Sequence, residues 1–212
     1  MTKVFLSAGH GGADPGAVAN GLYEKAINLN TLLACKSELE RHGVTVVCSR
    51  IKDENDPVTQ EVKEANASDA DIALSFHINA GGGNGFEAYY YDTSEKGKKL
   101  ASLCEKAIKK LGQNSRGLKS GNKLHFVNAT SMPAVLVETF FIDNGKDKAF
   151  GDTIVEQTSI GEAYAKAILE YFDITYKSKK TYRVQVGAYN SKANAEATKK
   201  KLKTAGFEAI IV

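Results

Sequence analysis

The sequence predicts an α/β protein with a mostly parallel, twisted sheet, helices on both faces, and a small C-terminal βαβ unit. Over the first 176 residues, short apolar runs of strand length alternate with helical periodicities. Several of these runs are continuously apolar, as strands buried on both faces are. A single strand–helix–strand pattern then follows a basic stretch. The 212 residues suffice for one sizeable domain and a small appendage.

Six segments of the first domain have the length and composition of strands. Most consist of aliphatic and aromatic residues bounded by glycine, asparagine or charged residues, which is the pattern of a buried strand. The expected strands span residues 4–8, 44–49, 72–77, 86–91, 125–128 and 134–141.

The segments between these strands carry helical periodicity. One helix is expected from about residue 22 to residue 41, because Gly43 is a typical C-terminal signal. Two others have apolar residues spaced by three and four positions, from Leu100 to Leu111 and from Ile160 to Tyr171. Thr153 and Glu156 have the spacing of a capping box before the last of these.

Composition and charge bound the classes of function. No run approaches the ~18 apolar residues of a membrane span, and three widely spaced cysteines favour neither a disulfide scaffold nor a cysteine-ligated metal.

We expect a domain at 1–175, a basic linker at 176–181 and a βαβ unit at 182–212. Residues 177–212 carry nine basic and two acidic side chains, against 19 and 23 in the remainder. A basic tail on an acidic body predicts an anionic partner for the tail.

Two histidines lie where strands of the predicted sheet end. His10 follows the first strand in a Gly-His-Gly-Gly loop, and His77 closes the strand at 72–77. Carboxyl ends of parallel strands share one edge, where ligands gather. Glu24, at the start of the first helix, would point to the same edge. Two imidazoles and a carboxylate form a typical catalytic zinc site. Alternatively, His10 only ends a strand and Glu24 only complements the helix dipole.

An acidic residue at the same edge is a candidate general base. Glu138 follows the apolar segment Ala134-Val135-Leu136-Val137. A glutamate within a buried apolar run is costly unless it is paired or functional. The alternative to a catalytic role is an ion pair with Arg116 or Lys123.

Four segments together resemble a known family: GHGGADPGA, then Glu24, then SFHINA, then MPAVLVETFFIDN. They are similar to the zinc-dependent N-acetylmuramoyl-L-alanine amidases of the amidase-3 type, over residues 1–173. The resemblance implies a zinc site of His10, Glu24 and His77, with Glu138 as the catalytic carboxylate. Ser7, Glu61 and Phe140 depart from the usual family residues, but none is a proposed ligand.

The resemblance implies a peptidoglycan hydrolase that cuts the amide between the lactyl group of N-acetylmuramic acid and L-alanine. Asn79, Asn128 and Arg116 are weaker candidates for substrate contacts. Two alternatives stay open: a zinc peptidase that cuts within the stem peptide, and a wall-binding protein without catalytic activity. The sequence favours neither a nucleic-acid partner nor a membrane partner, since the tail has few aromatic residues and no recognised nucleic-acid-binding motif.

The C-terminal segment, YRVQVGAY followed by a Lys- and Ala-rich helix and GFEAIIV, resembles the first half of a SPOR-type wall-binding module. Because half a module is too small to bury a convincing core, two chains could pair their halves in a homodimer. The N-terminus lacks the apolar core of a signal peptide. We therefore expect a phage or prophage lysin, of the endolysin or autolysin kind, that stays in the cytoplasm of the producing cell until lysis; a secreted bacterial amidase is the alternative.

Overall fold

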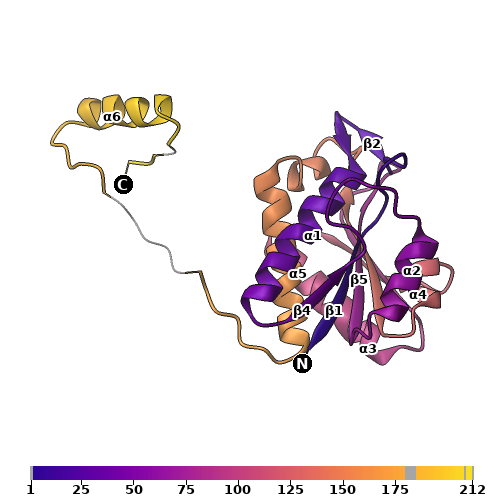
Figure 1. The fold of residues 1–212 in the computed structure, drawn as a ribbon. Coiled ribbons are helices and arrows are strands. Elements are labelled where there is room, and N and C mark those ends of the chain that lie inside the picture. The colour runs from indigo at the N-terminus through magenta and orange to yellow at the C-terminus, as the bar shows by residue number, and fades with distance from the viewer. Residues whose placement is uncertain (1, 180–184, 208, 212) are drawn as a thin grey trace. The chain divides into compact units, whose positions relative to one another are not determined.

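The computed structural model describes residues 2–179, 185–207 and 209–211, and the chain divides into two compact units, residues 1–177 and 178–212 (Figure 1). The larger unit contains a six-stranded sheet with strand order β4-β1-β5-β8-β6-β7. A separate two-stranded ribbon of β2 and β3 precedes the first helix. The strands are β1 (Lys3–Ala8), β2 (Val18–Ala19), β3 (Leu22–Tyr23), β4 (Thr45–Cys48), β5 (Ile72–Asn79), β6 (Phe86–Tyr90), β7 (Ser115–Ser120) and β8 (Ala134–Phe141).

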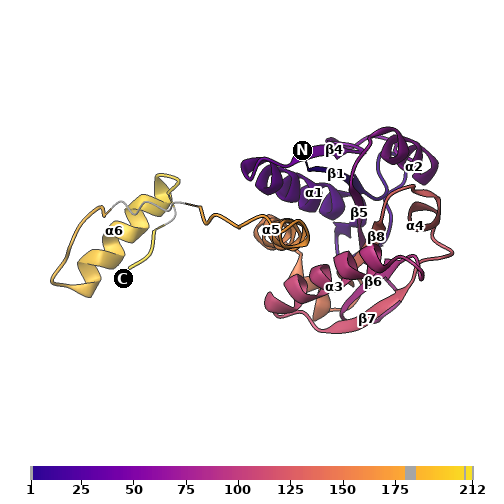
Figure 2. The ribbon, with the colours of Figure 1, turned by 90° about the horizontal axis from the view of Figure 1, so that it is seen from below.

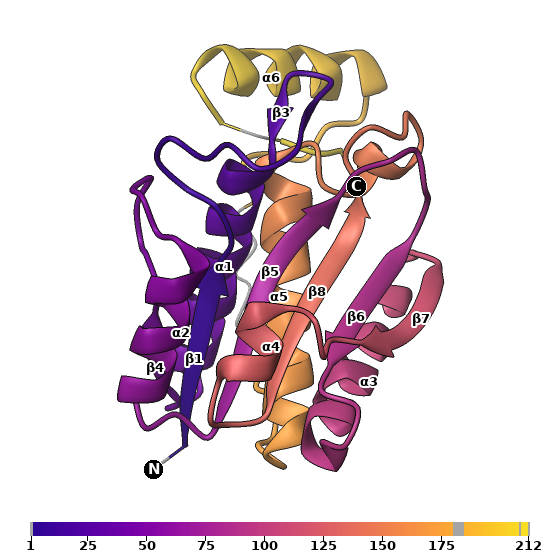
Figure 3. The same cartoon turned by 90° about the vertical axis from the view of Figure 1, so that its right-hand side faces the viewer.

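Strand direction divides the sheet into two parts. Strands β4, β1, β5 and β8 are parallel, so their carboxyl ends share one edge (Figure 3). Strand β6 is antiparallel to β8, and β7 is parallel to β6. The first residues of β6 and β7 therefore lie at the same edge as the last residues of the other strands. The predicted fold class, an α/β protein with a mostly parallel sheet, is confirmed.

Helices cover both faces of the sheet (Figure 2). On one face, α1, α3 and α5 pack together over the larger apolar core, which includes Leu6, Leu74 and Val137. On the other face, α2 and α4 cover a smaller core around Phe5 and Phe126. The helices of the first unit are α1 (Glu24–Arg41), α2 (Val58–Ala67), α3 (Glu95–Lys110), α4 (His125–Ala129), η1 (Asp147–Phe150) and α5 (Ile154–Tyr171).

Several local predictions were wrong. Residues 125–128, expected as a strand, belong to the short helix α4. Strand β7 and helix α2 lie where no regular element was expected. Thr153 is the N-cap residue of α5, but its side chain makes no capping hydrogen bond, so the predicted capping box does not form. Instead, Ser94 caps α3 by accepting a hydrogen bond from the Gly97 backbone N–H at 3.0 Å.

The first unit extends two residues into the predicted linker. The Tyr176 ring stacks on His42, with ring centroids 5.1 Å apart. The Lys177 backbone N–H donates to His42 Nε2 at 2.9 Å. His42 follows α1, whose other end begins at Glu24, and an 18-residue helix is about 27 Å long. The chain therefore leaves the first unit at the end of α1 remote from Glu24.

The second unit contains the helix α6 (Lys192–Thr204), which confirms the predicted central helix. The two strands predicted beside it lie partly outside the described residues. Residues 185–188 and 209–211, which are described, do not form strands. In the described part of the chain, no helix has the length and apolar character needed to cross a membrane.

Candidate metal centre and active site

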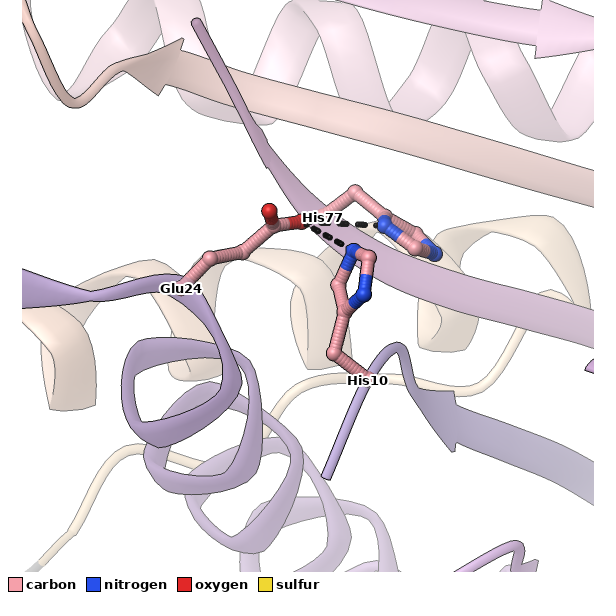
Figure 4. A group of neighbouring side chains, drawn as sticks. All are labelled: His10, Glu24 and His77. Carbon is pink, nitrogen blue, oxygen red and sulfur yellow. Dashed lines mark hydrogen bonds and ion pairs between the residues drawn. The ribbon is translucent and has the colours of Figure 1, made fainter. Parts of the chain in front are cut away.

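The structure brings the three predicted ligands together at the shared edge of the sheet. His10 lies in the loop after β1, Glu24 is the first residue of α1, and His77 lies near the end of β5 (Figure 4). Their ligand atoms all fall within 4.8 Å of one another. In the described part of the chain, this is the one group of three or more histidine, cysteine or acidic side chains so arranged. The predicted convergence of strand ends is what produces it.

Glu24 is the centre of this group. Its Oε1 atom lies 3.2 Å from His10 Nε2 and 3.0 Å from His77 Nδ1. The same oxygen accepts a hydrogen bond from the Ile78 backbone N–H at 3.1 Å, while Oε2 accepts one from the Ala17 N–H at 2.8 Å. Only 5% of the Glu24 side chain is exposed. These contacts fix the carboxylate in one orientation before any ligand binds.

The loop after β1 adopts a conformation that few sequences allow. His10 has φ of 66°, in the left-handed region that residues other than glycine rarely occupy. Its Nδ1 atom lies 2.8 Å from Asp14 Oδ2, which orients the ring so that Nε2 faces Glu24. Gly9 has no side chain for a specific reason: a Cβ there would lie 2.1 Å from the His77 ring. Any side chain at position 9 would therefore displace the His77 ring.

Arg50, which we did not predict as a site residue, forms hydrogen bonds that hold this loop in place. Its side chain is buried and donates to the carbonyl oxygens of Ala8 at 2.9 Å and Lys25 at 2.8 Å. It thereby connects the end of β1 to the start of α1, the two segments that carry His10 and Glu24. The sequence signal was the position of Arg50, directly after the expected second strand at residues 44–49.

The donor set fits a zinc ion. Two imidazole nitrogens and a carboxylate oxygen are typical zinc ligands, with bonds of about 2.0–2.1 Å. A tetrahedral site with such bonds separates its ligand atoms by about 3.3 Å. The 3.2 Å and 3.0 Å separations around Glu24 Oε1 are close to that value. His10 Nε2 and His77 Nδ1 both face Glu24 Oε1, so the cluster could bind a metal ion.

Electrostatics couple the three side chains. The hydrogen bond to Glu24 raises the pKa of His10 to about 9. Burial alone would raise the pKa of Glu24, but the hydrogen bonds from both histidines outweigh it and hold that pKa well below its usual range. Burial lowers the pKa of His77, yet the contact with Glu24 leaves it raised overall. Histidines bind metals in their neutral form, so metal binding here releases protons.

Glu138 lies beside the cluster but in a different environment. It is the register partner of His77 on the adjacent strand, so both side chains emerge on the same face of the sheet. Its Oε2 atom is buried and has no hydrogen-bond partner. Burial raises the pKa of Glu138 to about 7. The alternative ion pair with Arg116 does not form, because Arg116 contacts Glu87 instead.

The weaker predicted contacts separate into two groups. Asn79 lies at the site edge, where its Nδ2 atom donates to Glu87 Oε2 at 3.2 Å. Arg116 also lies there, at the start of β7. Asn128 does not: its Nδ2 donates to the Asn122 carbonyl, and it lines a hollow beside Ala134, at the start of β8.

Comparison with known proteins identifies the family. The family model described as N-acetylmuramoyl-L-alanine amidase matches residues 4–170. The chain belongs to this family. The amidase activity predicted from the sequence, hydrolysis of the bond between N-acetylmuramic acid and L-alanine in peptidoglycan, is therefore confirmed. A second model, the SPOR domain, matches residues 178–212, so the SPOR resemblance of the tail is confirmed as well.

Individual amidases of the family show how far the likeness extends. The N-acetylmuramoyl-L-alanine amidase CwlM of Bacillus licheniformis is 36% identical over 100% of this chain and 85% of its own length. The endolysin of Bacillus phage SPP1 is 40% identical over 84% of this chain and 69% of its own. The solved catalytic domain of CwlV from Bacillus (Paenibacillus) polymyxa superposes with a TM-score of 0.77 at 34% identity, covering 82% of this chain and 100% of that domain.

Proposed function

We propose that this amidase is zinc-dependent and that His10, Glu24 and His77 hold the zinc ion. The supporting observation is the convergence of two histidine nitrogens on one oxygen of a buried, hydrogen-bonded glutamate. A zinc ion bound there would polarise the lactyl carbonyl and lower the pKa of a water molecule toward ~7.

Glu138 is the general base of the proposed reaction. It accepts a proton as the water oxygen attacks the lactyl carbonyl carbon. It then delivers that proton to the alanine nitrogen as the carbon–nitrogen bond breaks, which leaves a muramic acid carboxylate and a free alanine amine. A pKa near 7 suits both steps, because a base must hold a proton briefly and then release it.

Digestion of purified peptidoglycan tests this proposal. We expect new amino termini at L-alanine only, together with a stoichiometric zinc content in the purified protein. New amino termini at D-residues would instead support the alternative of a zinc peptidase. A fully active protein that holds no zinc, and that a chelator does not inhibit, would contradict the assignment of the metal.

For the C-terminal unit we propose peptidoglycan binding through a homodimer of half modules. Several of its described apolar residues are exposed, including Val186 at 61%, Phe207 at 65% and Ile210 at 79%. Pairing would bury such residues. Sedimentation velocity over a range of concentrations should show dimers of the full chain but not of residues 1–177. Monomers in both cases would contradict the proposal. Retention in the cytoplasm until lysis, and the absence of nucleic-acid and membrane partners, stay predictions.

A further inference from the structure

A row of polar side chains continues across the sheet beyond Glu138. Because β6 runs antiparallel to β8, its second residue, Glu87, lies directly opposite Glu138. His77 lies opposite Glu138 on the other side. Residues directly opposite on neighbouring strands share a face. His77, Glu138 and Glu87 therefore occupy consecutive positions of one row, on β5, β8 and β6.

The Glu87 carboxylate forms ion pairs with two cationic side chains, Arg116 and Lys119. Its Oε1 atom lies 2.5 Å from Arg116 Nε and 2.5 Å from Lys119 Nζ, and the Tyr89 hydroxyl donates to Oε2 at 2.6 Å. Burial would raise the pKa of Glu87, but these three contacts keep it well below its usual range. Glu87 is thus ionised at neutral pH. One carboxylate facing two cations leaves an excess of one positive charge at this end of the row.

The two cations are held in place, yet they remain accessible. The Glu87 side chain is only 4% exposed, whereas those of Arg116 and Lys119 are 44% and 35% exposed. The Arg116 guanidinium lies 5.3 Å from the centroid of the Phe141 ring, and Lys119 Nζ lies 5.9 Å from that of Tyr89. Glu87 uses the Nε–H of Arg116; within the described part of the chain, the two Nη groups have no acceptor. A guanidinium presented in this way is suited to a carboxylate.

We propose that Arg116 and Lys119, positioned by Glu87, bind a carboxylate on the leaving peptide of the substrate. This inference rests on the proposed function, because the roles of the zinc ligands and Glu138 set the direction of the substrate along the row. The carbonyl carbon lies toward His77 and the metal centre, while the nitrogen that receives the proton lies toward Glu138. The peptide attached to that nitrogen then continues toward Glu87 and the cations.

The spacing identifies the carboxylate. Neighbouring strands lie about 4.8 Å apart, so the Glu87 cluster begins about one strand beyond Glu138. A peptide advances at most about 3.3–3.6 Å per residue. Alanine, whose nitrogen is released, spans this gap, and the next residue of the stem peptide reaches the cations. A free α-carboxylate on that second residue would accept hydrogen bonds from both side chains, whereas a carboxamide would carry no charge for them to bind.

Two soluble substrates distinguish these cases: muramyl tripeptides whose second residue is D-glutamate, with a free α-carboxylate, or D-isoglutamine, with a carboxamide. For the full-length, zinc-loaded wild-type protein we expect kcat/KM to be roughly 10- to 100-fold higher with the carboxylate, the range for hydrogen bonds to a charged group. Arg116→Gln and Lys119→Gln should each reduce this preference, and the double variant should remove it, because the carboxylate substrate is slowed far more than the carboxamide substrate. Lys109→Gln, on exposed α3 surface, should keep the full preference.

Other outcomes would overturn the inference in recognisable ways. Equal cleavage of both substrates by the wild type would exclude a carboxylate site, and this result needs no variant to fold. Variants that remain folded by circular dichroism but slow both substrates equally would show that the cations only stabilise Glu87. If the wild type released no alanine amino terminus from either substrate or from whole peptidoglycan, the proposed function itself would fail, and the inference with it.

Discussion

The site edge of the sheet has two regions, each built around one glutamate. The Glu24 carboxylate has hydrogen-bond or ion-pair partners on both oxygens. Both histidines and two backbone N–H groups contact it, and its pKa is lowered. Around Glu138, burial dominates, one oxygen has no partner, and the pKa is raised to about 7. The same type of side chain is thus held as an anion in one region and has a pKa near neutrality in the other. The difference arises from the contacts, because both residues are largely buried.

Removing the fixed anion should have the largest effect. Glu24→Gln replaces the carboxylate with a neutral amide, so the cluster loses its charged ligand. We expect the zinc content to fall and kcat to drop by about 10⁴-fold or more, because the Lewis acid itself is lost. Metal analysis and end-group release from peptidoglycan measure both effects. A Glu24→Gln protein that retains zinc and activity would remove the distinction between the two regions.

Removing the proton carrier should impair chemistry without removing the metal. Glu138→Gln keeps the side-chain size but cannot accept a proton. General acid–base catalysis contributes typically 10²- to 10⁴-fold, and we expect a loss of kcat in that range with an unchanged zinc content. The wild-type rate should rise with pH as Glu138 ionises, and this dependence should be absent from the residual rate of the variant. Loss of zinc in Glu138→Gln would show that Glu138 belongs to the metal site instead.

In the metal-free protein, the two glutamates should affect stability with opposite signs. The pKa of Glu138 rises from 4.5 to about 7 on folding, so its favourable contribution is complete below 4.5 and lost as pH rises through 7. The pKa of Glu24 is lowered instead, so its contribution is present above 4.5 and lost as pH falls through the folded-state value.

At about pH 8 in chelator, Glu138→Gln should therefore raise the free energy of unfolding by roughly 1–3 kcal/mol, and Glu24→Gln should lower it. Near pH 4.5 the gain from Glu138→Gln should disappear. Urea unfolding at both pH values measures these differences. Equal changes for the two variants would mean that their environments are alike.

The smallest effect should come from the exposed end of the Glu24 region. Asp14→Asn keeps a hydrogen-bond acceptor for His10 but removes a charge that raises the pKa of that ring. Groups that orient metal ligands typically contribute 10- to 100-fold to metal affinity, and Asp14 is 66% exposed. We expect a loss of zinc affinity near the lower limit, about 10-fold, measurable by competition with a chelator. Asp69→Asn is the matched control, because it alters an exposed carboxylate that precedes β5, at the edge of the sheet opposite the site.

The sequence was sufficient to predict the cluster around Glu24. It was not sufficient to predict that Glu87 follows Glu138 in the row of residues across the sheet. His10 and His77 follow apolar runs in a parallel pattern, and parallel strand ends share an edge, so their meeting could be deduced. The position of Glu87 depends on β6 running in reverse, and no local signal shows strand direction. Strand β7 was missed because Ser115–Ser120 contains glycine and charged residues, which have low strand propensity; pairing with β6 overrides that preference.

Other errors have similarly local causes. The apolar pair Phe126 and Val127 was interpreted as a strand, but so short a run cannot distinguish a strand from one turn of helix. The capping box at Thr153 and Glu156 matched in spacing only, since the Thr153 side chain does not reach the helix N–H groups and Glu156 Oε2 is buried without a partner. The contacts of Arg50 could not be predicted, because the β1 and α1 segments that it connects are distant from it in the sequence.

The reversal of β6 and β7 has a consequence for how such enzymes could be changed. The last residues of the parallel strands lie at the site, whereas β6 and β7 have their first residues there. These two strands belong to one continuous segment, from Phe86 to Ser120, that contains none of the proposed zinc ligands. This segment could be exchanged between relatives as one block. Engineered lysins could then acquire new preferences for wall chemistry while the hydrolytic apparatus is inherited intact.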